Sequence, residues 1–179
     1  AAKIVAETFF ERGIYIISAA GNEGNTETHT SGKIEFKGQI KDIELELTQD
    51  EDTIDIDIWV DKPDIVSIVL ISPTGEESKL LIEQDYKPVR GLFDLQGTSY
   101  SITYVYPTNF SGQEYARVNL TKVKKGIWKI RLIGQYITNG IYNAYLPNRV
   151  LLKPGTKFRE VDPLHTINYP ATYEEHITV

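Results

Sequence analysis

The residue with the clearest chemical potential is Asn22, in a run that reads SAAGNEG from Ser18 to Gly24. Its carboxamide carries a neutral NH₂ donor that needs no proton exchange, so it is suited to holding a reacting oxygen by a hydrogen bond. The competing interpretation is a simple turn, because Asn tolerates left-handed backbone and glycines stand at 21 and 24. The residue types alone leave both interpretations open.

The neighbours of Asn22 also allow two interpretations, one functional and one structural. Ala19, Ala20 and Gly21 have small or absent side chains, which either leave space for a large bound group or simply allow close packing. Glu23 adds a carboxylate that would either favour a basic partner or lie in solvent. The three histidines are scattered along the chain and show no metal-ligand spacing.

Two elements must position this run. Ala1–Arg12 is predicted to be a helix that ends at Gly13, and Ile14–Ile17 is a β-branched and aromatic run typical of a short buried strand. Asn22 therefore follows the end of a strand.

The middle of the chain is predicted to be β-structure almost throughout. Period-two alternation of apolar and polar residues marks half-buried antiparallel strands, and 66–71 is apolar on both faces, which predicts a central strand. Many short strands separated by turn signals predict a β-sandwich or jelly roll. The expected strands contain Ile34 and Phe36, 43–47, 54–60, 66–71, 99–106, 115–123, 127–133 and 141–146. The expected linkers are Asn25–Ser31 and Pro154–Leu164.

A second motif lies near the end of the sequence, where Tyr169–Tyr173 reads YPATY before the strand-like run His176–Val179. With SAAGNEG it resembles the subtilisin-like serine proteases (peptidase S8), in which the Asn loop is followed by a Tyr-Pro turn and a strand. Here a stretch too long for a loop separates the two motifs. Its Gly126–Trp128 and Gly140–Asn143 resemble the jelly roll inserted in a subgroup that includes the germination-specific proteases of spore formers.

This resemblance implies a fold and a domain organisation. The fold class would be mainly β, with a jelly-roll β-sandwich inserted between two segments of a subtilisin-like α/β protease domain that has a parallel sheet. Residues 1–28 and 161–179 would be the protease segments, and residues 29–160 the insertion. Strands at Ile14–Ser18 and His176–Val179 would run parallel and adjacent, because a parallel pair needs a long crossover.

The resemblance also implies a function. The chain would be a fragment of a subtilisin-like serine endopeptidase, with Asn22 as the oxyanion-hole donor. Ala19, Ala20, Gly21 and Glu23 would line the specificity pocket. The catalytic Ser, His and Asp are absent, so the fragment is expected to be inert. Ser99 follows a Gly-Thr step as the catalytic Ser does, but strong β formers come after it, which predicts an ordinary strand residue.

Composition limits the partners and cofactors. The net charge of −6 argues against nucleic acid, no apolar run reaches membrane-spanning length, and the lack of cysteine excludes disulfides. No cofactor is expected, beyond a weak cation that the resemblance places near Ala171, Tyr173 and His176. The expected partners are a protein or peptide substrate and the rest of the protease domain. The resemblance suggests a bacterial, extracellular or spore-associated protein.

The alternative function is a binding module that recognises a polysaccharide, a propeptide or a partner protein. Its aromatic residues would then form a sugar platform, although aromatics at period two are more typical of a sandwich core. The acidic residues 50–52, with Asp55 and Asp57, would bind calcium or, as we favour, form a solvated acidic edge. The aromatic residues in question are Trp59, Tyr100, Tyr104, Tyr106, Trp128, Tyr142 and Tyr145.

Overall fold

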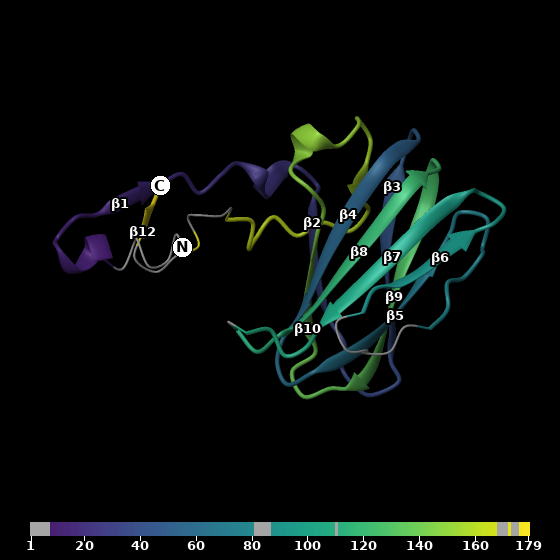
Figure 1. Cartoon of the computed structure of the whole chain (residues 1–179), viewed down its shortest axis with the longest axis horizontal. Helices are drawn as coiled ribbons and strands as arrows, with labels where there is room; N and C mark the ends of the chain where they lie inside the picture. Colours follow the sequence, from purple (N-terminus) through teal and green to yellow (C-terminus); the bar gives the residue numbers. More distant parts are fainter. Residues whose placement is uncertain (1–7, 81–86, 110, 168–171, 173–175) are drawn as a thin grey trace.

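The computed structural model describes residues 8–80, 87–109, 111–167, 172 and 176–179. They form a large β-sandwich and a small lobe, joined by two connecting segments that run side by side (Figure 1). The small lobe (residues 8–21 and 176–179) contains a helical turn at 8–11, strand β1 (Ile16–Ser18) and strand β12 (His176–Thr178). Gly13 has a φ of 74° just after the helical turn, so the predicted helix end is confirmed.

Two antiparallel sheets make up the sandwich. The larger has the order β2-β10-β4-β8-β7-β6 and the smaller has the order β11-β3-β9-β5. Two short 3₁₀ helices, η1 (Glu23–Asn25) and η2 (Arg149–Leu151), lie outside the sheets. The strands of the sandwich are β2 (His29–Lys33), β3 (Ile40–Leu47), β4 (Glu51–Val60), β5 (Ile65–Ile71), β6 (Val89–Phe93), β7 (Thr98–Val105), β8 (Glu114–Val123), β9 (Gly126–Tyr136), β10 (Ile141–Tyr145) and β11 (Lys157–Phe158).

The chain wraps between the two sheets in a regular order. Strands β2 to β5 alternate between the sheets, and β8 to β10 alternate on the way back, so that the early strand β2 and the late strand β10 are neighbours. This wrapping is that of a jelly roll, with β6 and β7 both added to one edge of the larger sheet. The predicted mainly β fold is therefore confirmed.

Period-two alternation explains the core. From Ile54 to Val60 in β4 and from Glu114 to Leu120 in β8, every second side chain is buried between the sheets, and the residues between them face outward. Trp128 lies at the centre, 1% exposed, with its Nε1 donating to the Lys124 carbonyl at 2.8 Å and its ring 5.2 Å from that of Phe93. Four of the seven aromatics considered for a sugar platform belong to this core: Tyr100, Tyr104, Trp128 and Tyr142.

Two strand predictions need correction. The strand placed at Ile34 and Phe36 is β2, which ends earlier, at Lys33. Ile34 is fully buried beyond that end and Phe36 is 61% exposed. Strand β5 lies at the edge of its sheet rather than at its centre. It is nevertheless buried on both faces, and the chain after it returns to pair with it, with the Ser78 N–H donating to the Leu70 carbonyl at 2.8 Å.

Two further strands were not predicted. Strand β6 lacks a run of alternating apolar residues, since Arg90 and Gly91 lie in its middle. Strand β11 has only two residues and lies inside the expected linker Pro154–Leu164, where it adds to β3 at the edge of the smaller sheet.

The pairing predicted between the two ends of the sequence is confirmed. Strand β1 runs parallel to β12, with Ile16 opposite His176 and Ser18 opposite Thr178. The ladder continues past the strands, because the Val179 N–H donates to the Ser18 carbonyl at 3.0 Å and the Ala20 N–H to the Val179 carbonyl at 2.6 Å. Among the described residues this is the one parallel pair, so they do not contain the α/β domain that the fold prediction placed around the sandwich. The predicted domain boundaries stay a prediction.

In the part of the chain that the structure describes, no helix is long and apolar enough to cross a membrane.

Candidate functional site

Asn22 lies two residues beyond the point where the β1–β12 ladder ends. Gly21 adopts a φ of 92°, which turns the chain out of the sheet, and Asn22 (φ −129°, ψ 26°) then opens the η1 turn. The Asn22 side chain is exposed and forms no capping hydrogen bond to that turn. Its amide is therefore presented to solvent at the carboxyl end of a parallel strand pair, a place where ligand sites of parallel sheets commonly form.

The other predicted site residues follow one another on the same short path. Ala19 and Gly21 are exposed, whereas Ala20 and Glu23 are partly buried. Thr26 donates from Oγ1 to the Glu23 carboxylate (2.9 Å to Oε2) and lies 2.7 Å from the Glu23 carbonyl oxygen. The small residues and the carboxylate thus flank the Asn22 amide along one continuous turn.

Beyond Glu23, the chain enters the sandwich through a connector (residues 23–28) that packs against the return segment (residues 159–167). A hollow of about 290 Å³ lies between them, lined by Glu23, Glu27 and Asp162 among others. A second hollow adjoins Glu23 on the side of Tyr145 and Ile167. Glu23 therefore lies where the turn that carries Asn22 meets the sandwich.

His29, the first residue of β2, fastens the return segment to the sandwich. Its Nδ1 lies 2.8 Å from the Asp162 carbonyl oxygen and its Nε2 lies 3.0 Å from Asn143 Oδ1. The ring is 2% exposed and stacks on Tyr145 with 4.4 Å between ring centroids. Both ring nitrogens are engaged, which supports a structural role for this histidine.

Asp162 completes that attachment. Its carboxylate accepts hydrogen bonds from the Ser31 hydroxyl at 2.5 Å and from the Leu164 N–H at 2.9 Å. These bonds, with the Ser31 bond the strongest cause, hold the pKa of Asp162 below its ordinary value. No local pattern indicated this contact, because residues 31 and 162 meet only in the folded chain.

Ser99 lies in β7, opposite Thr121 of β8 and Leu92 of β6. The prediction that it is an ordinary strand residue is confirmed.

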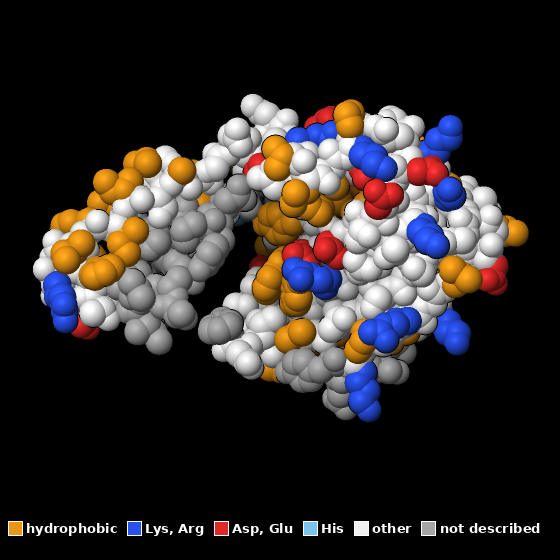
Figure 2. Space-filling view, turned by 45° about the horizontal axis from the view of Figure 1, so that its top comes forward, with side chains coloured by type: hydrophobic (Ala, Val, Ile, Leu, Met, Phe, Trp, Pro, Cys, Tyr) orange, Lys and Arg blue, Asp and Glu red, His pale blue; other side chains and the backbone are white. Residues whose placement is uncertain are grey.

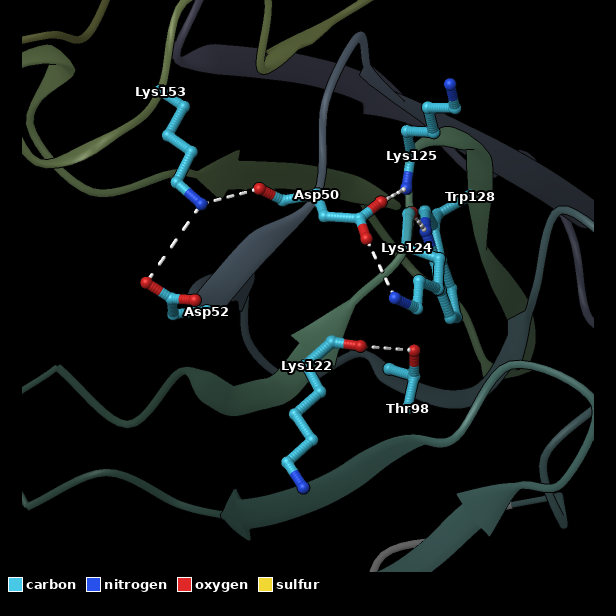
Figure 3. A network of polar contacts seen from close by, with 8 residues as sticks. All are labelled: Asp50, Asp52, Thr98, Lys122, Lys124, Lys125, Trp128 and Lys153. Atoms are coloured by element: carbon cyan, nitrogen blue, oxygen red, sulfur yellow. Dashed lines mark hydrogen bonds and ion pairs between the residues drawn. The ribbon is translucent and has the colours of Figure 1, made fainter.

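The acidic run at the start of β4 is surrounded by lysines (Figure 3). The Asp50 carboxylate accepts hydrogen bonds from Lys124 Nζ at 2.8 Å and from the Lys125 N–H at 2.9 Å. Lys153 Nζ donates to the Asp50 carbonyl at 2.6 Å and lies 4.0 Å from the Asp52 carboxylate. The ammonium groups of Lys124 and Lys153 lie where a metal ion would have to bind, which favours a charged surface at Asp50 and Asp52 rather than a calcium site. Glu51 between them departs from the predicted solvated edge, because it is 5% exposed and accepts hydrogen bonds from the Lys153 N–H and the Thr156 hydroxyl.

Within the described ranges no group of three His, Asp or Glu side chains is placed to hold a metal ion. Ala171 and Tyr173, two of the three positions named for a weak cation, lie outside the described residues, and His176 contributes its backbone to β12. That weak cation site stays a prediction.

Comparison with known proteins gives a match of structure but none of family or curated sequence. No family model matches the chain, and no curated protein matches its sequence. The solved structure of the CspB protease of Clostridium perfringens is similar to 96% of this chain, with a TM-score of 0.79 and 24% sequence identity. The chain spans 37% of the length of that protease. The chain therefore has the fold of part of a protease.

These findings correct the family assignment made from the sequence. Membership of the subtilisin-like family implies an α/β domain, whereas the described residues form antiparallel sheets apart from one pair of three-residue strands. No family model matches, and 24% identity to one protease establishes a shared fold alone. The assignment of the chain to that family is wrong as stated, and the supported statement is the coarser one of a protease-related fold.

Proposed function

We propose that this chain is part of a serine endopeptidase and that Asn22 is its oxyanion-hole donor. The observation that carries the proposal is the placement of Asn22: an exposed carboxamide just past the carboxyl end of β1, in a chain with the fold of part of a protease. Such a donor acts on the tetrahedral intermediate of acyl transfer, whose carbonyl oxygen becomes negative.

The chemistry suits a neutral donor on a fixed strand. The Asn22 NH₂ would donate to the developing oxyanion without itself changing protonation, and the β1–β12 ladder would keep its position constant during the reaction. The nucleophile and its base would come from elsewhere in a longer protein. The isolated chain would then have no hydrolytic activity.

The residues before and after Asn22 would contact the substrate. Ala19, Ala20 and Gly21 would form a wall with room for a large side chain, and Glu23 would place its carboxylate at the rim. The partners in this proposal are a protein or peptide substrate and the remainder of the protease, against which the small lobe would pack.

Exposed apolar residues on that lobe support the packing. Ile17 is 66% exposed and its neighbour across the ladder, Ile177, is 47% exposed. Hydrophobic side chains gather over the small lobe in Figure 2. A parallel pair is normally covered on both faces, so further elements of the same protein are the natural cover.

The test is kinetic and uses the longer parent protein. Asn22→Ala should lower kcat by roughly a hundredfold with little change in KM, because the lost bond exists mainly in the transition state. Asn25→Ala is the matched control, since Asn25 is an exposed asparagine on the same turn. Hydrolysis of a peptide p-nitroanilide and labelling by a fluorophosphonate are the readouts. A parent whose kcat is unchanged by Asn22→Ala would remove Asn22 from the mechanism.

A further inference from the structure

We propose that Thr26 is a positioning residue, which orients the turn carrying Asn22 and Glu23 and ties that turn to the sandwich. The inference rests on the function proposed above and deepens it, because it names what fixes the geometry of the same site. Its physical basis is a chain of hydroxyl groups that leads from Thr28, the residue before β2, through Thr26 to Glu23.

The hydroxyl chain is continuous and short. Thr28 Oγ1 lies 2.6 Å from Thr26 Oγ1, which in turn lies 2.7 Å from the Glu23 carbonyl oxygen and 2.9 Å from Glu23 Oε2. Both Glu23 atoms are acceptors, so the Thr26 proton points toward Glu23. The Thr28 hydroxyl must then donate to Thr26, which gives the chain one direction, from Thr28 through Thr26 to Glu23.

The far end of this chain is fixed in the sandwich. Thr28 is 5% exposed, and its carbonyl accepts the Leu146 N–H at 2.8 Å beyond the end of β10. Thr26 itself closes the turn a second time, because its N–H donates to the Glu23 carbonyl at 3.1 Å. One residue thus holds both the backbone and the carboxylate of Glu23.

The residue between the two threonines is held in an unfavourable conformation. Glu27 has a φ of 57°, in the left-handed region that a residue with a side chain seldom occupies. Two contacts keep it there: the Phe158 N–H donates to its carbonyl at 3.0 Å, and Lys157 Nζ lies 2.9 Å from its carboxylate. Strain of this kind persists only where surrounding contacts over-determine it, and it concentrates at functional sites.

The turn has few other anchors on the sandwich side. The η1 helix has three residues, buries no side chain and receives no side-chain cap from Asn22. Its glycine, Gly24, lies beside the return segment, since a Cβ there would sit 3.4 Å from the Pro163 carbonyl oxygen. Removing the Thr26 hydroxyl would therefore loosen the turn without disturbing the core.

The kinetic test uses the parent protein and two substitutions at one position. Thr26→Val keeps the shape and removes the hydroxyl, and it should lower kcat about tenfold, less than Asn22→Ala, with KM little changed. Thr26→Ser restores the hydroxyl and should recover most of the rate. The preference for Lys over Phe, measured as kcat/KM for a Lys p-nitroanilide divided by that for a Phe p-nitroanilide, should fall in Thr26→Val. The reason is that the Glu23 carboxylate, which would favour the basic side chain, loses its orientation. Thr121→Val, in β8, is the control.

A second measurement does not depend on catalysis. In the 179-residue chain, ¹⁵N relaxation should show lower order parameters for residues 21–25 in Thr26→Val than in Thr26→Ser, with the sandwich amides unchanged. Unchanged order parameters, or a normal kcat in a parent that Asn22→Ala impairs, would overturn the positioning role while leaving the proposed function intact. A parent insensitive to Asn22→Ala would overturn the proposed function instead, and the order parameters would then decide whether Thr26 positions the turn.

Discussion

The sandwich buries its apolar side chains, whereas the small lobe exposes them. In the sandwich, inward side chains of both sheets are buried, with Ile54, Ile56 and Ile58 of β4 all at 0% exposure. In the small lobe the paired residues Ile17 and Ile177 are both largely exposed. The sandwich therefore buries its own apolar side chains, whereas the small lobe, in the part that the structure describes, leaves apolar side chains exposed.

This difference separates stability from chemistry. The candidate site lies beside the lobe whose described apolar side chains are exposed, whereas the sandwich, which carries no candidate catalytic residue, has a fully buried core. The connector and the return segment join the two, and Thr26 and His29 lie at the sandwich end of these segments. Substitutions can test this separation.

The largest effect is expected in the sandwich core. Trp128→Ala should lower the free energy of unfolding of the chain by about 3–5 kcal/mol, because it leaves a large cavity and an unpaired Lys124 carbonyl. Trp59→Ala is the control on the outer face of the larger sheet, where the half-buried ring contacts Tyr115 with 4.5 Å between centroids. Urea unfolding followed by circular dichroism measures both. Equal losses for the two variants would contradict a core centred on Trp128.

A smaller and conditional effect is expected in the small lobe. Ile17→Asp should change the stability of the 179-residue chain by no more than about 0.5 kcal/mol, because the side chain is already exposed. In the parent protein the same change should lower the melting temperature, since it would bury a charge where an apolar side chain packs.

Val150→Asp serves as the matched control, because Val150 is 86% exposed on the sandwich and should be neutral in both proteins. If the parent tolerates Ile17→Asp as well as it tolerates Val150→Asp, the small lobe is not covered by the rest of the protein.

The smallest effect on stability is expected at Asp162, where the return segment meets the sandwich, and it depends on pH. The pKa of Asp162 is lowered in the folded chain, chiefly by the Ser31 hydroxyl, so its carboxylate stabilises the fold at pH values above its ordinary pKa of 3.8. That contribution is lost as the pH falls through the lower, folded pKa. The melting temperature of the wild type should therefore be higher than that of Asp162→Asn at pH 7, and the difference between the two should disappear toward pH 2. Asp94→Asn, which changes an exposed aspartate of the same chain, is the control.

Much of the sandwich could be predicted because its strands bury one face. From Ile43 in β3 and from Ile54 in β4, an isoleucine, leucine or valine stands at every second position, and this pattern does not depend on which strands pair with them. The parallel pairing of β1 with β12 was also predictable, but only from the resemblance, since nothing local relates Ile16 to His176.

The parts that escaped prediction depend on contacts distant in sequence. Strand β2 reads HTSGK and has no apolar alternation, yet Thr26, Thr28 and Thr30 recur at period two, a β-type signal that marks its start. The contacts of His29 with Asp162 and Asn143 join residues 133 and 114 positions apart, so no local pattern records them. Sequence could place Asn22 on a turn but could not show what holds that turn.

The pairing of β1 with β12 has a consequence for the order of events during synthesis. Ile16 and His176 are separated by 160 residues of sequence, so at 5–20 residues per second roughly 8–30 s pass before β1 can meet its partner on the ribosome. The sandwich, complete by residue 158, can fold within that interval. The turn bearing Asn22 would then be tethered to a finished sandwich before the β1–β12 pair forms, so the site would be assembled after the sandwich rather than before it.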